Sequence, residues 1–244
     1  MPEIKRVQAS LGRSGLTYIE DAKLAALATR ASVAARGTYY LCPLPRTQVG
    51  ADQLQRLLAP VWAQQQTLTP VWRPAEREAT EQEPELLAEG YEVTVPLEAT
   101  LDGRPVHWPE RGLVVRSVAW AQTQQRALET RLAKAQGERA ALTDRRQGKK
   151  VYTEAAEVLA VGEPILAKYQ VRGLLQLHCQ TREQERPRRR YRARPARVEV
   201  ERHVHLTARV DEAACEHAHR RLGWRVYATN HRAAQVSLAH AGLA

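Results

Sequence analysis

The sequence predicts an α/β fold, and three segments carry this prediction. Residues 15–45 have the pattern of a strand, a helix and a second strand in immediate succession. Residues 90–121 alternate apolar and polar side chains around Asp102-Gly103, a dipeptide that favours a tight hairpin turn. Residues 171–229 contain further strand patterns with a helix among them. Helices and strands therefore share the chain.

The first of these segments, GLTYIEDAKLAALATRASVAARGTYYLCPLP, places a carboxylate where a strand ends. Residues 16–19 are a short β-prone run, and Asp21 follows them. Residues 22–35 are rich in Ala and Leu without Gly or Pro, which predicts a helix that ends before Gly37. Residues 38–44 are β-prone again, so a crossover helix is expected to join two sheet strands. The carboxyl end of a sheet strand is a common position for a catalytic or metal-binding group.

Asp21 has two interpretations from the residues alone. An Asp in front of Ala-Lys-Leu-Ala is a good helix N-cap, because its carboxylate accepts a hydrogen bond from a free backbone N–H. Its position after a strand fits a metal ligand instead. Glu20 is a poor substitute for such a ligand, since neighbouring side chains of a strand point to opposite faces.

Between the first unit and the arginine-rich stretch, helical and β patterns follow one another. A short helix is predicted near residues 52–66, followed by a loop. After the hairpin of residues 90–121, one apolar stripe predicts an amphipathic helix over residues 120–142 that packs on its own domain. A further helix is predicted over residues 153–169, and Gly162-Glu163-Pro164 is expected to kink or split it.

Two predicted strands, residues 171–181 and 197–210, flank a stretch that is dense in arginine. The stretch ERPRRRYRARPARVE has seven arginines, and its prolines disfavour a helix, so an exposed loop is expected. Guanidinium groups pair well with phosphates, which makes the loop a candidate contact for the DNA backbone; a solvated charged loop is the alternative. A helix over residues 210–222 and a strand over residues 224–229 follow. The arginines are Arg186, Arg188, Arg189, Arg190, Arg192, Arg194 and Arg197.

Composition and charge favour a nucleic-acid partner inside the cell. The formal net charge of +10 over 244 residues suits a polyanion, although codon bias in a GC-rich genome also enriches Arg and Ala. Three widely separated cysteines argue against a disulfide framework and for a reducing compartment. No apolar run is long enough for a transmembrane helix, and the first residues lack the apolar core of a signal peptide. We therefore expect a cytoplasmic protein without membrane contact.

A zinc site is the other chemistry that the sequence offers, and the spacing does not support it. His203 and His205 share a strand face, and Cys215 and His219 lie one helical turn apart. No CxxC or HExxH pattern accompanies them, so we interpret them as solvent-facing or structural side chains. Cys42 is expected in the core rather than as a nucleophile, because no His or Asn is tied to it by the sequence.

Three ordered blocks resemble the DDE-class insertion-sequence transposases, in the bacterial group whose RNase H-like core carries a β-rich insertion domain. The first block is residues 15–45, with PEIKRVQASLGRSG before it. The second is QGKKVYTEAAEVLAVGEPILAKYQVRGLL, residues 147–175, and the third is RLGWRVYATN, residues 221–230. The resemblance implies a partial RNase H-like core, residues 1–46, an insertion region, residues 47–206, and a return to the core, residues 207–244.

The resemblance also implies a chemistry. Members of this group hold divalent metal ions, Mg²⁺ among them, with two Asp and one Glu, and they cleave and transfer DNA strands. Asp21 matches the second Asp, as both catalytic residue and metal ligand. No strand for the first Asp and no helix for the Glu can be recognised, so an internal fragment with an incomplete set of ligands is expected, because one carboxylate cannot hold two metal ions.

The sequence leaves two possible functions. A third possibility is a remnant without a function. The chain is either a transposase fragment whose family activity is DNA transposition, or a non-catalytic DNA-binding or regulatory protein derived from a transposase. DNA is the expected partner, with a full-length transposase or a second copy of the chain as a protein partner.

Overall fold

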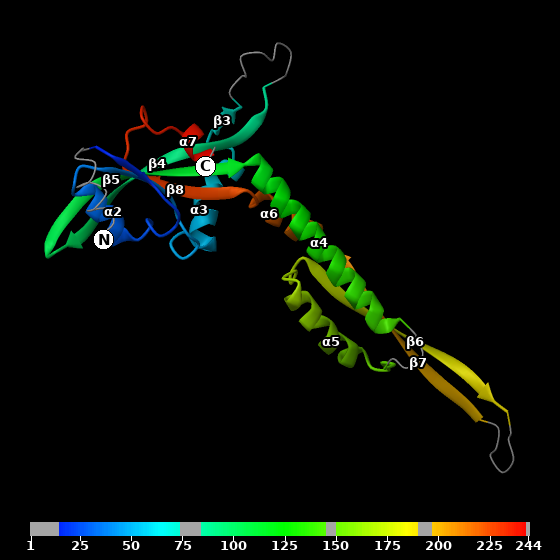
Figure 1. The fold of residues 1–244 in the computed structure, drawn as a ribbon. Helices are drawn as coiled ribbons and strands as arrows, with labels where there is room; N and C mark the ends of the chain where they lie inside the picture. Colours follow the sequence, from blue (N-terminus) through cyan, green and yellow to red (C-terminus); the bar gives the residue numbers. More distant parts are fainter. Residues whose placement is uncertain (1–14, 74–83, 145–149, 190–196, 243–244) are drawn as a thin grey trace. The chain divides into compact units, whose positions relative to one another are not determined.

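The computed structural model describes residues 15–73, 84–144, 150–189 and 197–242 (Figure 1). By backbone contacts the chain forms two compact units. Unit 1 contains residues 1–122 and 222–244, and unit 2 contains residues 123–221. These units are defined by contacts between residues. The domain boundaries after residues 46 and 206 rest on the resemblance to transposases, and they stay a prediction.

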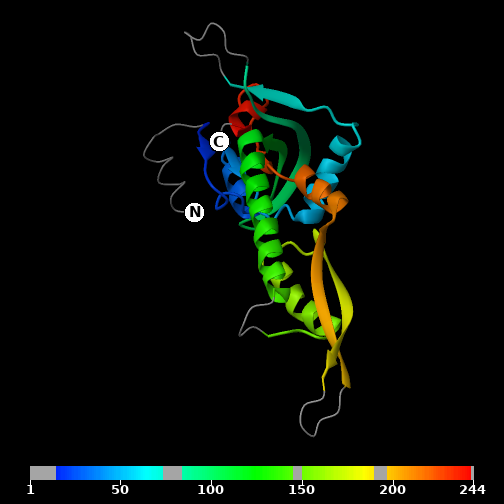
Figure 2. The ribbon, with the colours of Figure 1, turned by 90° about the vertical axis from the view of Figure 1, so that its right-hand side faces the viewer.

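Unit 1 is built on a six-stranded mixed sheet in the order β1-β2-β8-β5-β4-β3. Only β1 and β2 run parallel, and every other neighbouring pair in the sheet is antiparallel. The long strands β4 and β5 bend strongly, so the sheet curls into a half-barrel (Figure 2). The strands are β1 (Thr17–Ile19), β2 (Tyr39–Pro43), β3 (Thr69–Trp72), β4 (Leu86–Leu101), β5 (Arg104–Ser117) and β8 (Trp224–Thr229).

The hairpin of β4 and β5 confirms the turn predicted at Asp102-Gly103. Both turn residues have positive φ, +48° and +76°, as a tight two-residue hairpin turn requires. The two strands pair without interruption from Leu101 opposite Arg104 to Ala88 opposite Ser117. Gly90 is required within β4, because a Cβ there would lie 2.4 Å from the Val114 carbonyl oxygen.

Among the described residues of unit 1, the helices that accompany this sheet are α2 (Leu27–Ala34), α3 (Ala51–Trp62) and α7 (Leu238–Gly242). Alternation along the strands divides the core into layers. Val114 and Val226 pack with Leu58 of α3 on one face of the sheet. Leu113 and Tyr227 belong to the opposite face and pack with α7. The sheet is therefore covered on both faces, which explains its apolar strands.

The helix predicted over residues 22–35 begins later than expected. The backbone N–H groups of Leu24 and Ala25 donate to the carbonyls of Asp21 and Ala22, so this stretch forms tight turns before α2 starts at Leu27. The strands on either side, β1 and β2, lie where the sequence predicts them and pair in parallel through α2 as the crossover.

Unit 2 combines a β-hairpin with helices. Helix α4 (Val118–Thr143) begins in unit 1 and continues through unit 2, and the elements confined to unit 2 are α5 (Ala155–Lys168), β6 (Leu175–Arg188), β7 (Arg197–Val210) and α6 (Glu212–Arg220). Side chains of α4, α5 and the hairpin form a common core that includes Ala135, Ile165 and Leu175. Helix α5 continues through Gly162 and Pro164, so these residues do not split it. A Cβ at Gly162 would lie 2.7 Å from Leu177, so this glycine permits close helix-to-hairpin packing.

Candidate nucleic-acid interface

The β6–β7 hairpin forms a two-stranded ribbon with one apolar and one polar face. Its strands have 14 residues each and pair in continuous register from Leu175 opposite Val210 to Arg188 opposite Arg197. Leu175, Leu177 and Leu206 lie on the apolar face and pack in unit 2. The other face, the polar ribbon face, consists of His178, Gln180, Arg182, Gln184, Arg186 and Arg188 of β6 with Glu199, Glu201, His203, His205, Thr207 and Arg209 of β7.

The expected arginine-rich loop is shorter than the sequence suggests. Strand β6 continues through Arg188, so Arg186 and Arg188 lie within the ribbon rather than in a loop. Pro187 is tolerated because β6 is an edge strand and needs no second hydrogen-bonded neighbour. Arg189 follows the strand and is exposed. Arg197 begins β7, while Arg190, Arg192 and Arg194 lie outside the described residues.

Carboxylates of the opposite strand pair with the ribbon arginines. Arg186 Nη1 lies 3.1 Å from Glu201 Oε1, and Arg188 Nε lies 2.8 Å from Glu199 Oε2. The hydrogen bond to Glu199 raises the pKa of Arg188 further above its ordinary value, so this guanidinium stays charged. Exposed ion pairs of this kind contribute little stability because water screens them, so a competing phosphate can replace the carboxylate at little cost.

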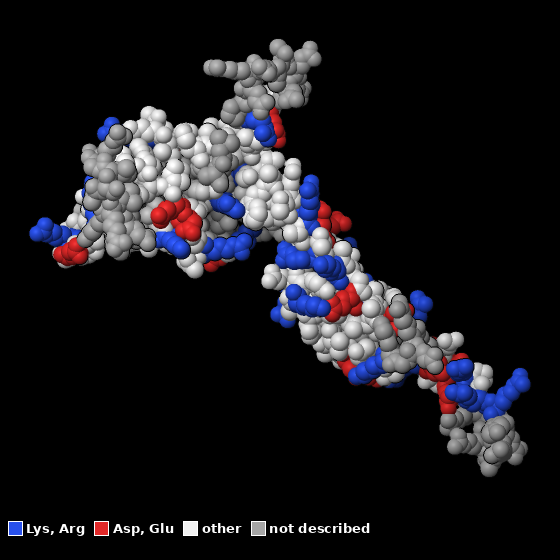
Figure 3. All heavy atoms as spheres, viewed as in Figure 1, with Lys and Arg blue, Asp and Glu red and all other residues white. Residues whose placement is uncertain are grey.

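The polar ribbon face combines a two-stranded architecture with exposed arginines. A two-stranded β-ribbon fits the major groove of B-DNA. Among the described residues, Arg182 and Arg209 on the polar ribbon face have no ion-pair partner. Lys and Arg side chains gather near the described ends of β6 and β7, with a few carboxylates among them (Figure 3). This arrangement offers guanidinium groups to a phosphate backbone and no specific geometry for reading bases.

Asp21 lies two residues after the end of β1 and is exposed to solvent. Its Oδ1 accepts a hydrogen bond of 2.9 Å from the Lys23 backbone N–H, which fixes a local turn. The interpretation of Asp21 as the helix N-cap is wrong, because Ala26 occupies the N-cap position of α2. In the part of the chain that the structure describes, no group of three or more His, Cys, Asp or Glu side chains is arranged to hold a metal ion. The described residues around Asp21 therefore do not fit a two-metal centre.

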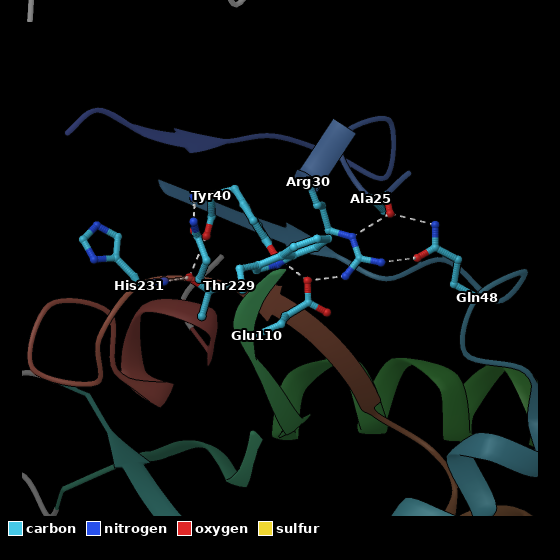
Figure 4. A network of polar contacts seen from close by, with 9 residues as sticks. Ala25, Arg30, Tyr40, Gln48, Glu110, Thr229 and His231 are labelled. Atoms are coloured by element: carbon cyan, nitrogen blue, oxygen red, sulfur yellow. Dashed lines mark hydrogen bonds and ion pairs between the residues drawn. The ribbon is translucent and has the colours of Figure 1, made fainter. Parts of the chain in front are cut away.

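A buried polar network lies between α2, β2 and β5 (Figure 4). No local sequence motif predicts it. Arg30 of α2 forms an ion pair with Glu110 of β5, and both residues are less than 9% exposed. The Tyr40 hydroxyl donates to Glu110 and accepts a hydrogen bond of 2.8 Å from Trp108 Nε1. Burial, followed by the charge of Glu110, raises the pKa of Tyr40 well above its usual range. Every charged group of the network thus has a partner.

The network also holds the chain that follows Asp21. Arg30 Nε and Gln48 Nε2 both donate to the Ala25 carbonyl, at 2.9 Å and 2.8 Å. Ala25 lies in the turn segment between β1 and α2, so these bonds fix that segment to α2 and to the loop after β2 (Figure 4). We assign the network a structural role, because its members are buried and already paired.

His231 ties the edge strand β1 to the segment after β8. Its Nε2 lies 2.8 Å from Thr17 Oγ1, its Nδ1 lies 2.8 Å from Gln235 Oε1, and its ring stacks on Tyr39 with 3.9 Å between centroids. Cys42 is fully buried, as expected, and burial raises the pKa of its thiol to about 12. A thiol in this environment is a core side chain rather than a nucleophile.

Comparison of the chain with protein-family models, with curated proteins and with solved structures finds no match in any of the three. None of the described helices is long and apolar enough to cross a bilayer. Fold and site together define a mixed α/β protein whose second unit carries an arginine-bearing β-ribbon.

Proposed function

We propose that the chain is a DNA-binding protein derived from a DDE-class insertion-sequence transposase, and that its β6–β7 ribbon contacts the phosphate backbone. The observation that carries this proposal is the polar ribbon face, where Arg182, Arg186, Arg188 and Arg209 lie on one side of an exposed two-stranded hairpin. Arginine binds phosphate through bidentate hydrogen bonds, and each neutralised phosphate releases counterions.

The first unit supports descent from a transposase. A strand, an exposed Asp, a crossover helix and a parallel strand follow in the order that the sequence resemblance requires. We therefore propose that β1, α2 and β2 are the remaining part of an RNase H-like core, and that Asp21 is inherited from its catalytic set. In the family, this Asp is one ligand of a Mg²⁺ centre that cleaves and joins DNA strands.

Binding without strand cleavage is the function that we assign to this chain. A two-metal reaction requires several oxygen ligands that converge on ions about 3.5–4 Å apart. Asp21 supplies one carboxylate group, and the described residues assemble no metal-binding group around it. A chain that recognises the same DNA as a full-length transposase would compete for that DNA and so regulate the transposase. Two copies of the chain that bind the same DNA would be brought together on it.

The test measures duplex binding and strand cleavage in one tube, with Mg²⁺ present and salt varied. Arg186→Gln/Arg188→Gln/Arg189→Gln should weaken binding and reduce the salt slope by as much as about 2.7, because each phosphate contact contributes about 0.9. The matched control removes three exposed arginines of unit 1, with Arg56→Gln/Arg104→Gln/Arg232→Gln, and should change binding less.

Cleavage is scored with the unchanged chain and with Asp21→Asn. We expect intact DNA in both reactions. Metal-dependent cleavage that disappears in Asp21→Asn would show a working nuclease and would overturn the non-catalytic assignment. Equal loss of binding in the two triple variants would show that net charge, and not the ribbon, attracts DNA.

A further inference from the structure

Unit 2 contains a cleft of about 630 Å³ beside strand β7. The short segment from Lys150 to Thr153 forms one wall, and β7 from Val200 to Val204 forms the other. Arg186 of β6 and the end of α4 complete the lining. The volume lies within the range of small-molecule sites, which is about 300–1,000 Å³. We call this feature the Lys150 cleft.

The ionisable groups of the Lys150 cleft are mostly basic. Lys150, Arg186 and Arg202 are cationic, and His203 adds an imidazole. The carboxylates of the lining are Asp144 and Glu201. Cations from three separate parts of the chain therefore line one space, with Arg186 on the polar ribbon face and Arg202 on the opposite face of the ribbon. Such a group can hold an anion that displaces the carboxylates now paired with it.

The cations are held by exposed carboxylates that an anion can displace. Lys150 pairs with Glu157, and the Lys150 side chain is 62% exposed. Arg202 Nη1 lies 3.4 Å from Glu154 and its Nε lies 2.9 Å from Glu183, with about half of the Arg202 side chain exposed. Such pairs contribute little stability because water screens them. A phosphate oxygen offers the same cations an equivalent charge-assisted hydrogen bond.

We propose that the Lys150 cleft binds the phosphate group of a nucleotide. Lys150 and Arg202 approach the phosphate from the two walls, and Arg186 extends the site onto the polar ribbon face. The volume leaves room for the sugar and base beside the phosphate. Tyr152 lines the same wall, and Lys150 Nζ lies 4.9 Å from the centroid of its ring. The proposal deepens the function proposed above and rests on it, because a DNA strand bound by the ribbon would place one of its own nucleotides in this cleft.

Calorimetric titration of the full chain with thymidine 5′-monophosphate tests the proposal. Lys150→Gln/Arg202→Gln should weaken binding about tenfold or more, since two charge-assisted contacts are lost. Arg126→Gln/Lys134→Gln removes the same charge from exposed positions of α4 outside the cleft and should leave the affinity within about twofold. Thermal unfolding of both variants verifies that the fold is retained. Thymidine without phosphate should not bind.

Oligothymidylate without a terminal phosphate identifies the source of the nucleotide. Tighter binding of the oligomer than of the monophosphate assigns the site to a DNA strand, and the reverse assigns it to a free nucleotide; either order supports the cleft. Failure of the monophosphate and the oligomer to bind, equal binding of thymidine, or unchanged affinity in Lys150→Gln/Arg202→Gln overturns it. Duplex binding by the same preparation separates this failure from failure of the proposed function.

Discussion

Two sets of Arg–Glu pairs occupy opposite environments in this molecule. In unit 1, Arg30 and Glu110 are buried between a helix and the curled sheet, and Tyr40 completes their hydrogen bonding. In unit 2, Arg186 and Arg188 pair with carboxylates across an exposed ribbon, where their side chains remain more than half accessible to solvent. The chemical groups are the same, and only the surroundings differ.

The difference separates a structural pair from a binding surface. A charge taken out of water must keep its partner, because an uncompensated buried charge costs several kcal/mol. A solvated charge can exchange its partner for another anion at little cost. The buried pair is therefore suited to fix α2 and the turn after Asp21, and the exposed pairs are suited to release arginines to phosphates.

The largest expected effect comes from breaking the buried pair. Glu110→Gln removes the carboxylate charge and leaves the Arg30 guanidinium buried without a counterion. We expect the free energy of unfolding to fall by about 3 kcal/mol or more, measured by denaturant titration. Arg30→Met combined with Glu110→Leu should recover part of this loss, because it removes both charges. A loss below about 1 kcal/mol in Glu110→Gln would show that water reaches the pair.

A smaller effect is expected from the hydroxyl that completes the network. Tyr40→Phe leaves Trp108 Nε1 without its acceptor and Glu110 without one donor. An unsatisfied buried polar group costs about 1–3 kcal/mol, and denaturant titration should show a loss in this range. Tyr39→Phe is the matched control, since it keeps the ring that stacks on His231 and should change stability by less than about 1 kcal/mol. Equal losses in both variants would argue against the network.

Much of the fold was predictable from the sequence because local patterns determine it. The Asp102-Gly103 turn, the parallel pair around α2 and the final strand β8 follow from turn chemistry and from β-prone runs. The sequence pattern does not predict strand β3, because this strand is short, contains Pro70 and buries only Val71. The five-residue helix α7 was too short for its periodicity to be recognised.

The sites show where local patterns give no information. Arg30 and Glu110 are separated by 80 positions, and only the curl of the sheet brings them together. The ribbon arginines were recognised from their density, but the extent of β6 depends on pairing with β7, which composition does not reveal. The Lys150 cleft joins segments that no motif connects.

Alkaline pH provides a third test of the buried region. Burial raises the pKa of Cys42 to about 12, whereas an exposed thiol has a pKa near 9. The unfolded chain therefore releases this proton first, so the stability contributed by Cys42 is complete below pH 9 and falls as the pH rises above it. Between pH 8 and pH 10 the unchanged chain should lose about 1.4 kcal/mol more than Cys42→Ala, measured by denaturant titration at each pH. Identical pH profiles would show that the Cys42 thiol is accessible to solvent.

The smallest effect on stability is expected on the ribbon, where it accompanies a gain in binding. Glu199→Gln/Glu201→Gln removes the carboxylates that face Arg188 and Arg186 and should change the free energy of unfolding by less than about 1 kcal/mol. The same change frees two guanidinium groups for phosphates and lowers local negative charge, so duplex DNA should bind several-fold more tightly at low salt. Glu129→Gln/Glu163→Gln, at exposed positions of α4 and α5, removes the same number of charges and is the control. Weaker DNA binding in the ribbon variant would mean that the carboxylates hold the arginines in their binding geometry, and that these pairs resemble the buried one after all.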